Sequence, residues 1–326
     1  MNHVERFRAV MDFRPVDRLP RIEWASWWDQ TVERWRAEGL PTSDRYAMYD
    51  YFGLDPYYQC WFQPRGSGYP ETPHGKGAVR HMDDYVALLP HLYPPQDAAA
   101  ALGPWAEAQR RGEAVVWITL DGFFWFPRTL LGVEPHLYAF YDQPELLHRI
   151  NADLVAWEMG VLRRLARTCA PTFMTFAEDM SYNHGPMLSK ALFDEFLAPY
   201  YRQIVPLLRE LDILPLVDSD GDVTALVPWL ESVGVEGFLP LERQAGVDGG
   251  RLRAAHARLR LIGHYDKMVM PRGEEAMRRE FERLLPLMRS GGFILSVDHQ
   301  TPPGVSLAEY RVYLRLLNEY TCRAAE

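Results

Sequence analysis

Short apolar runs, of the length that buried strands have, recur along the chain. The runs at 213–217 and 293–297 are the clearest, and each ends in polar residues. A continuous apolar run with little alternation is typical of strands that are buried on both faces of a parallel sheet. The sequence therefore predicts strands at 19–24, 114–119, 172–176, 213–217, 236–240, 260–263 and 293–297.

Helical periodicity fills several of the intervals between these runs. Apolar residues recur every three or four positions from Leu147 to Leu165 and again from Met277 to Met288, as they do on the buried face of a helix. Ser306 and Glu309 form a capping box at the start of a last helix.

Strands that alternate with helices predict parallel βαβ units. Seven visible runs, with an eighth expected between 57 and 82, favour an α/β fold of the (β/α)8 barrel type. We expect an N-terminal extension and an insertion over the barrel mouth at 61–95, where periodicity is poor and Gly, Pro and His are frequent. No boundary or repeat is visible, so a single domain over 1–326 is predicted.

Composition limits the function. The 326 residues are 48% hydrophobic and 24% charged with a formal net charge of −9, which disfavours nucleic acid and anionic membranes as partners. No window has the length of apolar residues that a membrane span needs, and the charged N-terminus has no apolar signal core. The three cysteines form no CxxC pair or disulfide framework. We expect a cytoplasmic location.

Polar residues follow most of the predicted strands. In a parallel barrel, these positions converge at one mouth, and here they are Glu23, Trp24, Asp121, Glu178, Asp179, Asp218, Asp220, Glu242, His264, Asp266, Asp298 and His299. So many carboxylates repel one another unless a cation, a proton or an arginine compensates. Arg128 is a candidate for that arginine, or for the anchor of a substrate carboxylate.

Two aspartates and a histidine are the leading candidates for a metal site. Asp218 and Asp220 lie two apart, so both face the same side of an extended segment. With His299 they offer two oxygens and a nitrogen, a set that can hold zinc or a harder divalent ion. Glu178 is expected as the fourth ligand or as a general base, which makes Glu178, Asp220 and His299 the predicted catalytic residues.

Each of these residues also has a structural interpretation. The segment 218–222 is a good strand-to-helix turn in which Asp222 caps a helix. His299 could donate to a backbone carbonyl, and Glu178 could belong to an acidic loop.

Aromatic and polar residues near the strand ends are candidates for binding substrate. A tryptophan cluster would suit a flat or apolar molecule, although such aromatics often only pack the barrel. His264 could reach the mouth, and Asn183 could position the substrate or satisfy a turn. The predicted substrate-binding side chains are Trp24, Trp28, Trp125, Arg128, Asn183, His184 and His264.

Several segments resemble the uroporphyrinogen decarboxylase-like superfamily over nearly the whole chain. They are 6–11 with 15–20, Asp218-Ser-Asp-Gly221, Gly263-His-Tyr-Asp-Lys267, and 291–299 with Pro302-Pro303. The resemblance implies a (β/α)8 barrel. It also implies one of two chemistries, decarboxylation without a cofactor or zinc-dependent transfer of a methyl group between a thiol or other acceptor and a corrinoid protein.

Departures from both branches shape the functional prediction. The segment 22–29 lacks the paired arginines of the decarboxylases, so porphyrinogen decarboxylation is not expected. The methyltransferases hold zinc with a His-x-Cys and a later Cys, and these positions correspond here to Asp218-Ser-Asp220 and Asp298-His299. Carboxylates make a harder, more Lewis-acidic site than thiolates, which favours polarising an oxygen over activating a thiol.

The leading prediction is an enzyme, a metal-dependent methyltransferase or demethylase. It would move a methyl group between a small methylated substrate, such as a methoxy compound, and a corrinoid cofactor or a corrinoid protein. The cofactors implied are a divalent metal, zinc in the first place, and the corrinoid. Two alternatives stay open: a decarboxylase (lyase) of a small or tetrapyrrole carboxylate, and a non-catalytic barrel that binds a small ligand or a tetrapyrrole. The sequence also leaves a homodimer open.

Overall fold

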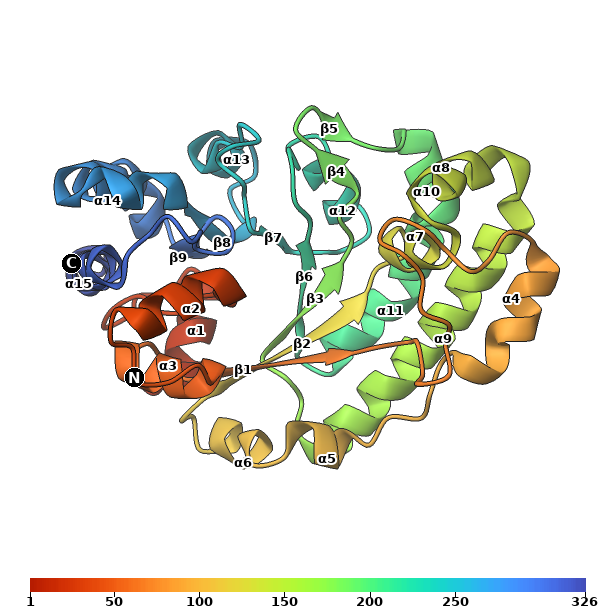
Figure 1. The fold of residues 1–326 in the computed structure, drawn as a ribbon, viewed down its shortest axis with the longest axis horizontal. Coiled ribbons are helices and arrows are strands. Elements are labelled where there is room, and N and C mark those ends of the chain that lie inside the picture. Colours follow the sequence, from red (N-terminus) through yellow and green to blue (C-terminus); the bar gives the residue numbers. More distant parts are fainter.

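A curved parallel sheet of seven strands forms the centre of the molecule (Figure 1). The computed structural model describes residues 1–326. The strands follow one another in the sheet in the order β1-β2-β3-β6-β7-β8-β9, and every neighbouring pair is parallel. Their bounds are β1 Tyr57–Phe62, β2 Val115–Asp121, β3 Phe173–Ala177, β6 Leu214–Asp218, β7 Gly237–Leu239, β8 Arg260–Tyr265 and β9 Phe293–Val297. A two-stranded hairpin stands apart, with β4 Ser181–Tyr182 and β5 Gly185–Pro186.

Helices surround the sheet and connect its strands. In the first half they are α1 His3–Met11, α2 Asp29–Ala37, α3 Arg45–Phe52, α4 Met82–Leu88, α5 Ala98–Leu102, α6 Trp105–Arg110, α7 Trp125–Leu131, α8 Val133–Asp142 and α9 Pro144–Thr168. In the second half they are α10 Lys190–Phe196, α11 Ala198–Glu210, α12 Val227–Glu231, α13 Gly249–Ala255, α14 Glu274–Arg289 and α15 Leu307–Arg323. Two 3-10 turns, η1 Leu89–His91 and η2 Lys267–Arg272, complete the chain. None of the helices combines the length and the apolar character that crossing a membrane requires.

The predicted α/β fold with a parallel sheet is confirmed, but the predicted first strand is not a strand. Residues 19–24 have no ladder pairing, although they run between β1 and β9. The Trp24 amide donates to Ser296 Oγ of β9 at 3.2 Å, and Tyr57 Oη of β1 donates to the Glu23 carbonyl at 2.6 Å. Side-chain hydrogen bonds thus connect this segment to both neighbours without ladder pairing, and the sheet has seven strands.

Helix α1 covers the end of the sheet where the strands begin. The Phe7 ring stacks on Phe173 with centroids 4.8 Å apart, and the Gly292 amide donates to the Val10 carbonyl at 2.8 Å. These contacts connect α1 to the starts of β3 and β9. At the opposite end of the sheet, the strands finish and the loops that follow them begin.

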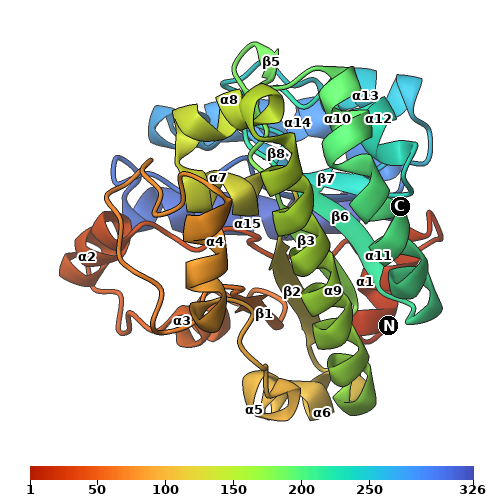
Figure 2. The ribbon, with the colours of Figure 1, turned by 90° about the vertical axis from the view of Figure 1, so that its right-hand side faces the viewer.

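The segment expected over the mouth packs along one side of it. Figure 2 shows α4 beside the long helix α9. Tyr85 Oη donates to Asp153 Oδ2 at 2.8 Å, and Trp157 Nε1 donates to the Pro94 carbonyl at 2.8 Å. A bridge between Lys76 and Gly132 reaches the turn between α7 and α8. This insertion therefore packs mainly against the helices that follow β2, while its first residue, Trp61, contacts Asp121 at the end of β2.

Candidate active site

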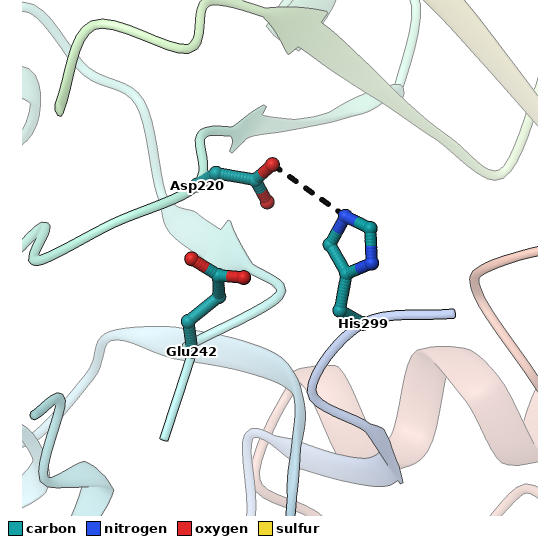
Figure 3. Close-up of side chains that lie close together, drawn as sticks. All are labelled: Asp220, Glu242 and His299. Carbon is teal, nitrogen blue, oxygen red and sulfur yellow. Dashed lines mark ion pairs between the residues drawn. The ribbon is translucent and has the colours of Figure 1, made fainter. Parts of the chain in front are cut away.

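Three side chains from three strand ends converge at the mouth of the sheet (Figure 3). Asp220 follows β6, Glu242 follows β7 and His299 follows β9. One carboxylate oxygen of each acid and a ring nitrogen of His299 all lie within 4.8 Å of one another. His299 Nε2 and Asp220 Oδ2 are 3.6 Å apart. All three side chains are partly buried, so they share one environment that solvent can still reach.

The turn after β6 holds this cluster together. Gly221 has a φ of +83°, and a Cβ there would lie 2.7 Å from the backbone of Tyr182, so only glycine fits. Its amide donates to Glu242 Oε2 at 2.9 Å. The glycine in the sequence Asp-Ser-Asp-Gly thus allows the β4–β5 hairpin to approach and fixes Glu242 beside Asp220.

Negative charge accumulates around the cluster. Burial and the charge of Asp220 raise the pKa of Asp179 to about 6, and Asp179 Oδ1 accepts from the Asp220 amide at 3.3 Å. Burial and the neighbouring aspartates hold the pKa of Asp218 well above its usual value, and burial and Asp220 also raise the pKa of Glu242. Asp220 raises the pKa of His299. Several carboxyl groups compete for one imidazole, so the site favours binding a cation or protons.

A metal ion fits the groups present. Two carboxylates and one imidazole are a donor set that zinc accepts, with room for further ligands from solvent or substrate. The nearest lysine does not neutralise this cluster directly, because Lys267 Nζ pairs with Asp298 Oδ1 at 3.0 Å. Of the predicted metal ligands, the structure brings Asp220 and His299 together with Glu242.

A pocket of about 360 Å³ opens next to His299. Its lining residues are Trp24, Ala25, Ser26, Arg45, Gln59, Trp61, Asp218, His299 and Gln300. Asp218 therefore lies on the pocket wall, although it is outside the three-residue cluster. The volume is at the lower end of the range for small-molecule sites.

The structure places Glu178 outside the three-residue cluster, and its carboxylate is hydrogen-bonded within the protein. Glu178 is completely buried and accepts hydrogen bonds from the amides of Phe123 at 2.9 Å and Phe124 at 2.8 Å. The Trp125 amide and Tyr201 Oη also donate to it. Glu178 thus caps the start of α7 in this structure.

Arg128 and Trp125 also have partners within the protein. Arg128 Nη1 donates to the Asp179 carbonyl at 2.8 Å, and its guanidinium lies 4.5 Å from the centre of the Trp125 ring. Neither residue lines the pocket beside His299. Arg128 supports the loop of Asp179 instead of presenting itself as an anchor for substrate.

His264 does not point to the mouth. It is buried, its Nδ1 lies 3.0 Å from the Leu241 carbonyl, and its Nε2 accepts from the Gly249 amide at 3.0 Å. Burial lowers its pKa to about 4. Both ring nitrogens are used, so the neutral imidazole positions the residue before Glu242 and does not bind substrate.

The remaining predicted substrate residues differ in exposure. Trp24 lines the pocket and lies edge-on to His299, with ring centroids 6.2 Å apart. Trp28 is exposed just before α2, and Asn183 and His184 are exposed in the hairpin turn between β4 and β5. Only Trp24 of these four contributes to the pocket wall.

Glu242, Asp179 and Arg45 were not selected from the sequence. Glu242 and Asp179 were among the strand-end residues, but nothing local set them apart from their neighbours. Arg45 gave no signal, because it comes from a helix far from the strand ends in sequence and reaches the pocket through the packing of α3 on β1.

Comparison with known proteins identifies one matching family. The sequence model of the family described as uroporphyrinogen decarboxylase (URO-D) matches residues 129–320. No curated protein sequence matches the chain significantly.

Among solved structures, a methyltransferase from Methanosarcina mazei is similar with a TM-score of 0.68 and 14% identity, over 98% of this chain and 99% of that one. A putative vitamin-B12 independent methionine synthase from Listeria monocytogenes has a TM-score of 0.47 and 11% identity, over 94% and 97% of the two chains. The first of these supports the fold.

Proposed function

The chain belongs to the uroporphyrinogen decarboxylase family, and from this membership and its strand-end site we propose that it is a metal-dependent methyltransferase. The observation that carries the proposal is the convergence of Asp220, Glu242 and His299 beside a pocket of small-molecule size. The similar fold of the Methanosarcina methyltransferase supports it. The methyl group would move between a small methylated substrate and a corrinoid.

Asp220, Glu242 and His299 would hold the metal, with zinc as the first candidate. When bound, a divalent ion supplies Lewis acidity toward a substrate oxygen. Loss of a methyl group from an ether or ester oxygen leaves negative charge on that oxygen, and a cationic site stabilises such charge. A set with two carboxylates suits oxygen better than it suits a thiol.

The other residues of the site act through position. His264 and the Gly221 amide fix the Leu241–Glu242 segment, while Arg128 fixes the Asp179 loop. Asp218 and Trp24 line the pocket where a substrate would lie. This arrangement is pre-organised, since each support is itself hydrogen-bonded.

We place the corrinoid outside this pocket. A volume of about 360 Å³ suits a molecule much smaller than a tetrapyrrole. The corrinoid would therefore approach the mouth, carried by a partner protein or bound at its rim.

Metal content provides the first test. The wild-type protein, loaded with zinc and freed of excess, should retain about one ion per chain by elemental mass spectrometry. Asp220→Asn and His299→Ala should lose it. Asp222→Asn is the matched control, because Asp222 is in the same turn but its carboxylate accepts from the Thr224 amide. Absence of bound zinc in the wild type would contradict the proposed site.

Methyl transfer provides the second test. Cob(I)alamin offered with methoxy compounds should be converted to its methylated form, followed by absorbance, only with the zinc-loaded wild type. Methylation at the same rate with His299→Ala would show that the cluster is not the reactive site.

A decarboxylase is the second candidate, and the His299–Asp220 pair is the observation that favours it. An imidazole whose pKa is raised by a neighbouring carboxylate can, in its protonated form, donate a proton to a carbanion. Carbon dioxide release from small acids without any corrinoid or metal would favour this reaction. Its absence, together with metal-dependent methyl transfer, would exclude it.

A further inference from the structure

Arg45 is an arginine without an acidic partner in the wall of the active-site pocket. It makes no ion pair, whereas Arg18, for example, is paired with Asp55 at 2.6 Å. Its Nη2 donates to Tyr57 Oη at 2.5 Å and to Gln59 Oε1 at 3.1 Å, which are both neutral. Its Nε is buried and has no hydrogen-bond partner. A guanidinium offers five N–H groups, so much of the capacity of Arg45 is unused.

An unpaired, partly desolvated cation is unfavourable unless an anion comes to it. Its neutral partners hold it in place without neutralising it. Gln59 is itself fixed, because its Nε2 donates to Thr119 Oγ1 at 3.2 Å. The guanidinium is thus pre-positioned at the pocket, and a planar fork of donors matches a carboxylate in two-point contact.

Two tryptophans in the pocket wall indicate what carries that anion. The indole nitrogens of Trp24 and Trp61 are both engaged, by the Val297 carbonyl at 2.6 Å and by Asp121 Oδ1 at 2.8 Å. Apart from these nitrogens, the two side chains offer apolar ring surface. Fixed aromatic walls in a small pocket suit a flat apolar body.

We propose that this pocket binds a small aromatic carboxylic acid, with its carboxylate on Arg45. The inference rests on the proposed function only for the reaction at the end of the ligand that is opposite its carboxylate. That end would lie toward His299, which lines the same pocket and belongs to the metal cluster. Arg45 is then the specificity residue for acids, a role that we do not assign to Arg128 because Arg128 does not line this pocket.

Binding of two probes of matched shape tests the inference without any turnover. The probes are 4-methoxybenzoate and its neutral analogue 4-methoxybenzyl alcohol, measured by calorimetry with the wild type and with Arg45→Gln. The acid should bind the wild type more tightly than the alcohol does. Arg45→Gln should weaken the acid by about 10- to 100-fold, as loss of hydrogen bonds to a charged group does, and change the alcohol by less than about threefold.

Two controls separate binding from folding. Arg36→Gln removes an exposed arginine of α2 and should leave both affinities unchanged. Arg45→Lys keeps the charge but not the fork, so its affinity for the acid should be intermediate. If Arg45→Gln does not fold, the comparison of acid and alcohol on the wild type still decides, by calorimetry or by thermal shift.

The outcomes distinguish this inference from the proposed function. Equal affinity of the acid and the alcohol, no binding of the acid, or an acid affinity that Arg45→Gln leaves unchanged would each overturn it. Selective acid binding that depends on Arg45, in a protein that neither holds zinc nor transfers methyl groups, would uphold it and refute the proposed reaction.

Discussion

Two groups of acidic side chains at the strand ends of one sheet have different surroundings. Glu178, after β3, accepts hydrogen bonds from three backbone amides and a tyrosine hydroxyl. Asp220 and Glu242, after β6 and β7, face each other and His299, and much of their oxygen capacity is free. A carboxylate whose lone pairs the protein has already used stabilises the fold, while one left with free lone pairs can serve a ligand. Strand-end position alone does not separate the two.

The largest effect on stability is expected from removing Glu178, the carboxylate whose hydrogen bonds stabilise the fold. Glu178→Ala leaves several buried donors unpaired at the start of α7, each costing about 1–3 kcal/mol, so the free energy of unfolding should fall by at least about 3 kcal/mol. Denaturation in urea measures it, with Glu178→Gln as the milder variant because it keeps one acceptor. A loss below about 1 kcal/mol would mean that Glu178 is not a structural cap.

A smaller effect on stability, but a large one on binding, is expected at the cluster. Asp220→Ala should change the stability of the metal-free protein by less than about 0.5 kcal/mol, because its side chain is still 41% exposed. Zinc affinity should fall by more than about 100-fold, since even residues behind the ligands cost 10- to 100-fold. Competition with a chelating dye measures the affinity. A variant that binds zinc normally but unfolds easily would reverse the roles of the two groups.

The regular elements could be predicted because their patterns are local. The residues that mark the inner face from Leu147 to Leu165 are buried in α9, and the capping box of Ser306 and Glu309 begins α15. The first strand was predicted wrongly, because an apolar run alone does not show whether the backbone of a segment pairs with its neighbours. A further strand was expected between 57 and 82, and β1 lies inside that interval. Its bounds were not predicted, because the stretch from Tyr57 to Phe62 is only partly buried and lacks a clear apolar run.

The sequence predicted only which residues follow the ends of the strands and therefore lie near the mouth of the sheet. Position after a strand selected Asp220 and His299 as candidates. It also selected Glu178, whose hydrogen-bond partners lie at the start of α7. Which carboxylates are left free depends on tertiary hydrogen bonds, and Arg45 depends on how α3 packs. Neither leaves a pattern in the sequence.

Glu158 provides a third case, a buried carboxyl group that neither the fold nor the site uses. It lies on α9, completely buried, and neither of its oxygens has a hydrogen-bond partner. Burial, with the charges of Asp121 and Glu178, holds its pKa well above the usual value. The folded protein therefore keeps a proton that the unfolded chain releases near pH 4.5.

This proton makes stability depend on pH. Because the folded state binds more protons above about pH 4.5, the free energy of unfolding decreases as the pH rises toward the folded pKa of Glu158. Glu158→Gln removes that contribution, and the variant should be more stable than the wild type by about 1–3 kcal/mol at about pH 8. At about pH 5 the two should differ little. Urea denaturation at both pH values measures the difference, and Glu145→Gln, an exposed change on the same helix, should follow the wild type. If the free energy of unfolding of Glu158→Gln and of the wild type changed with pH in the same way, Glu158 would have a hydrogen-bond partner in solution. It would then be a structural carboxylate like Glu178.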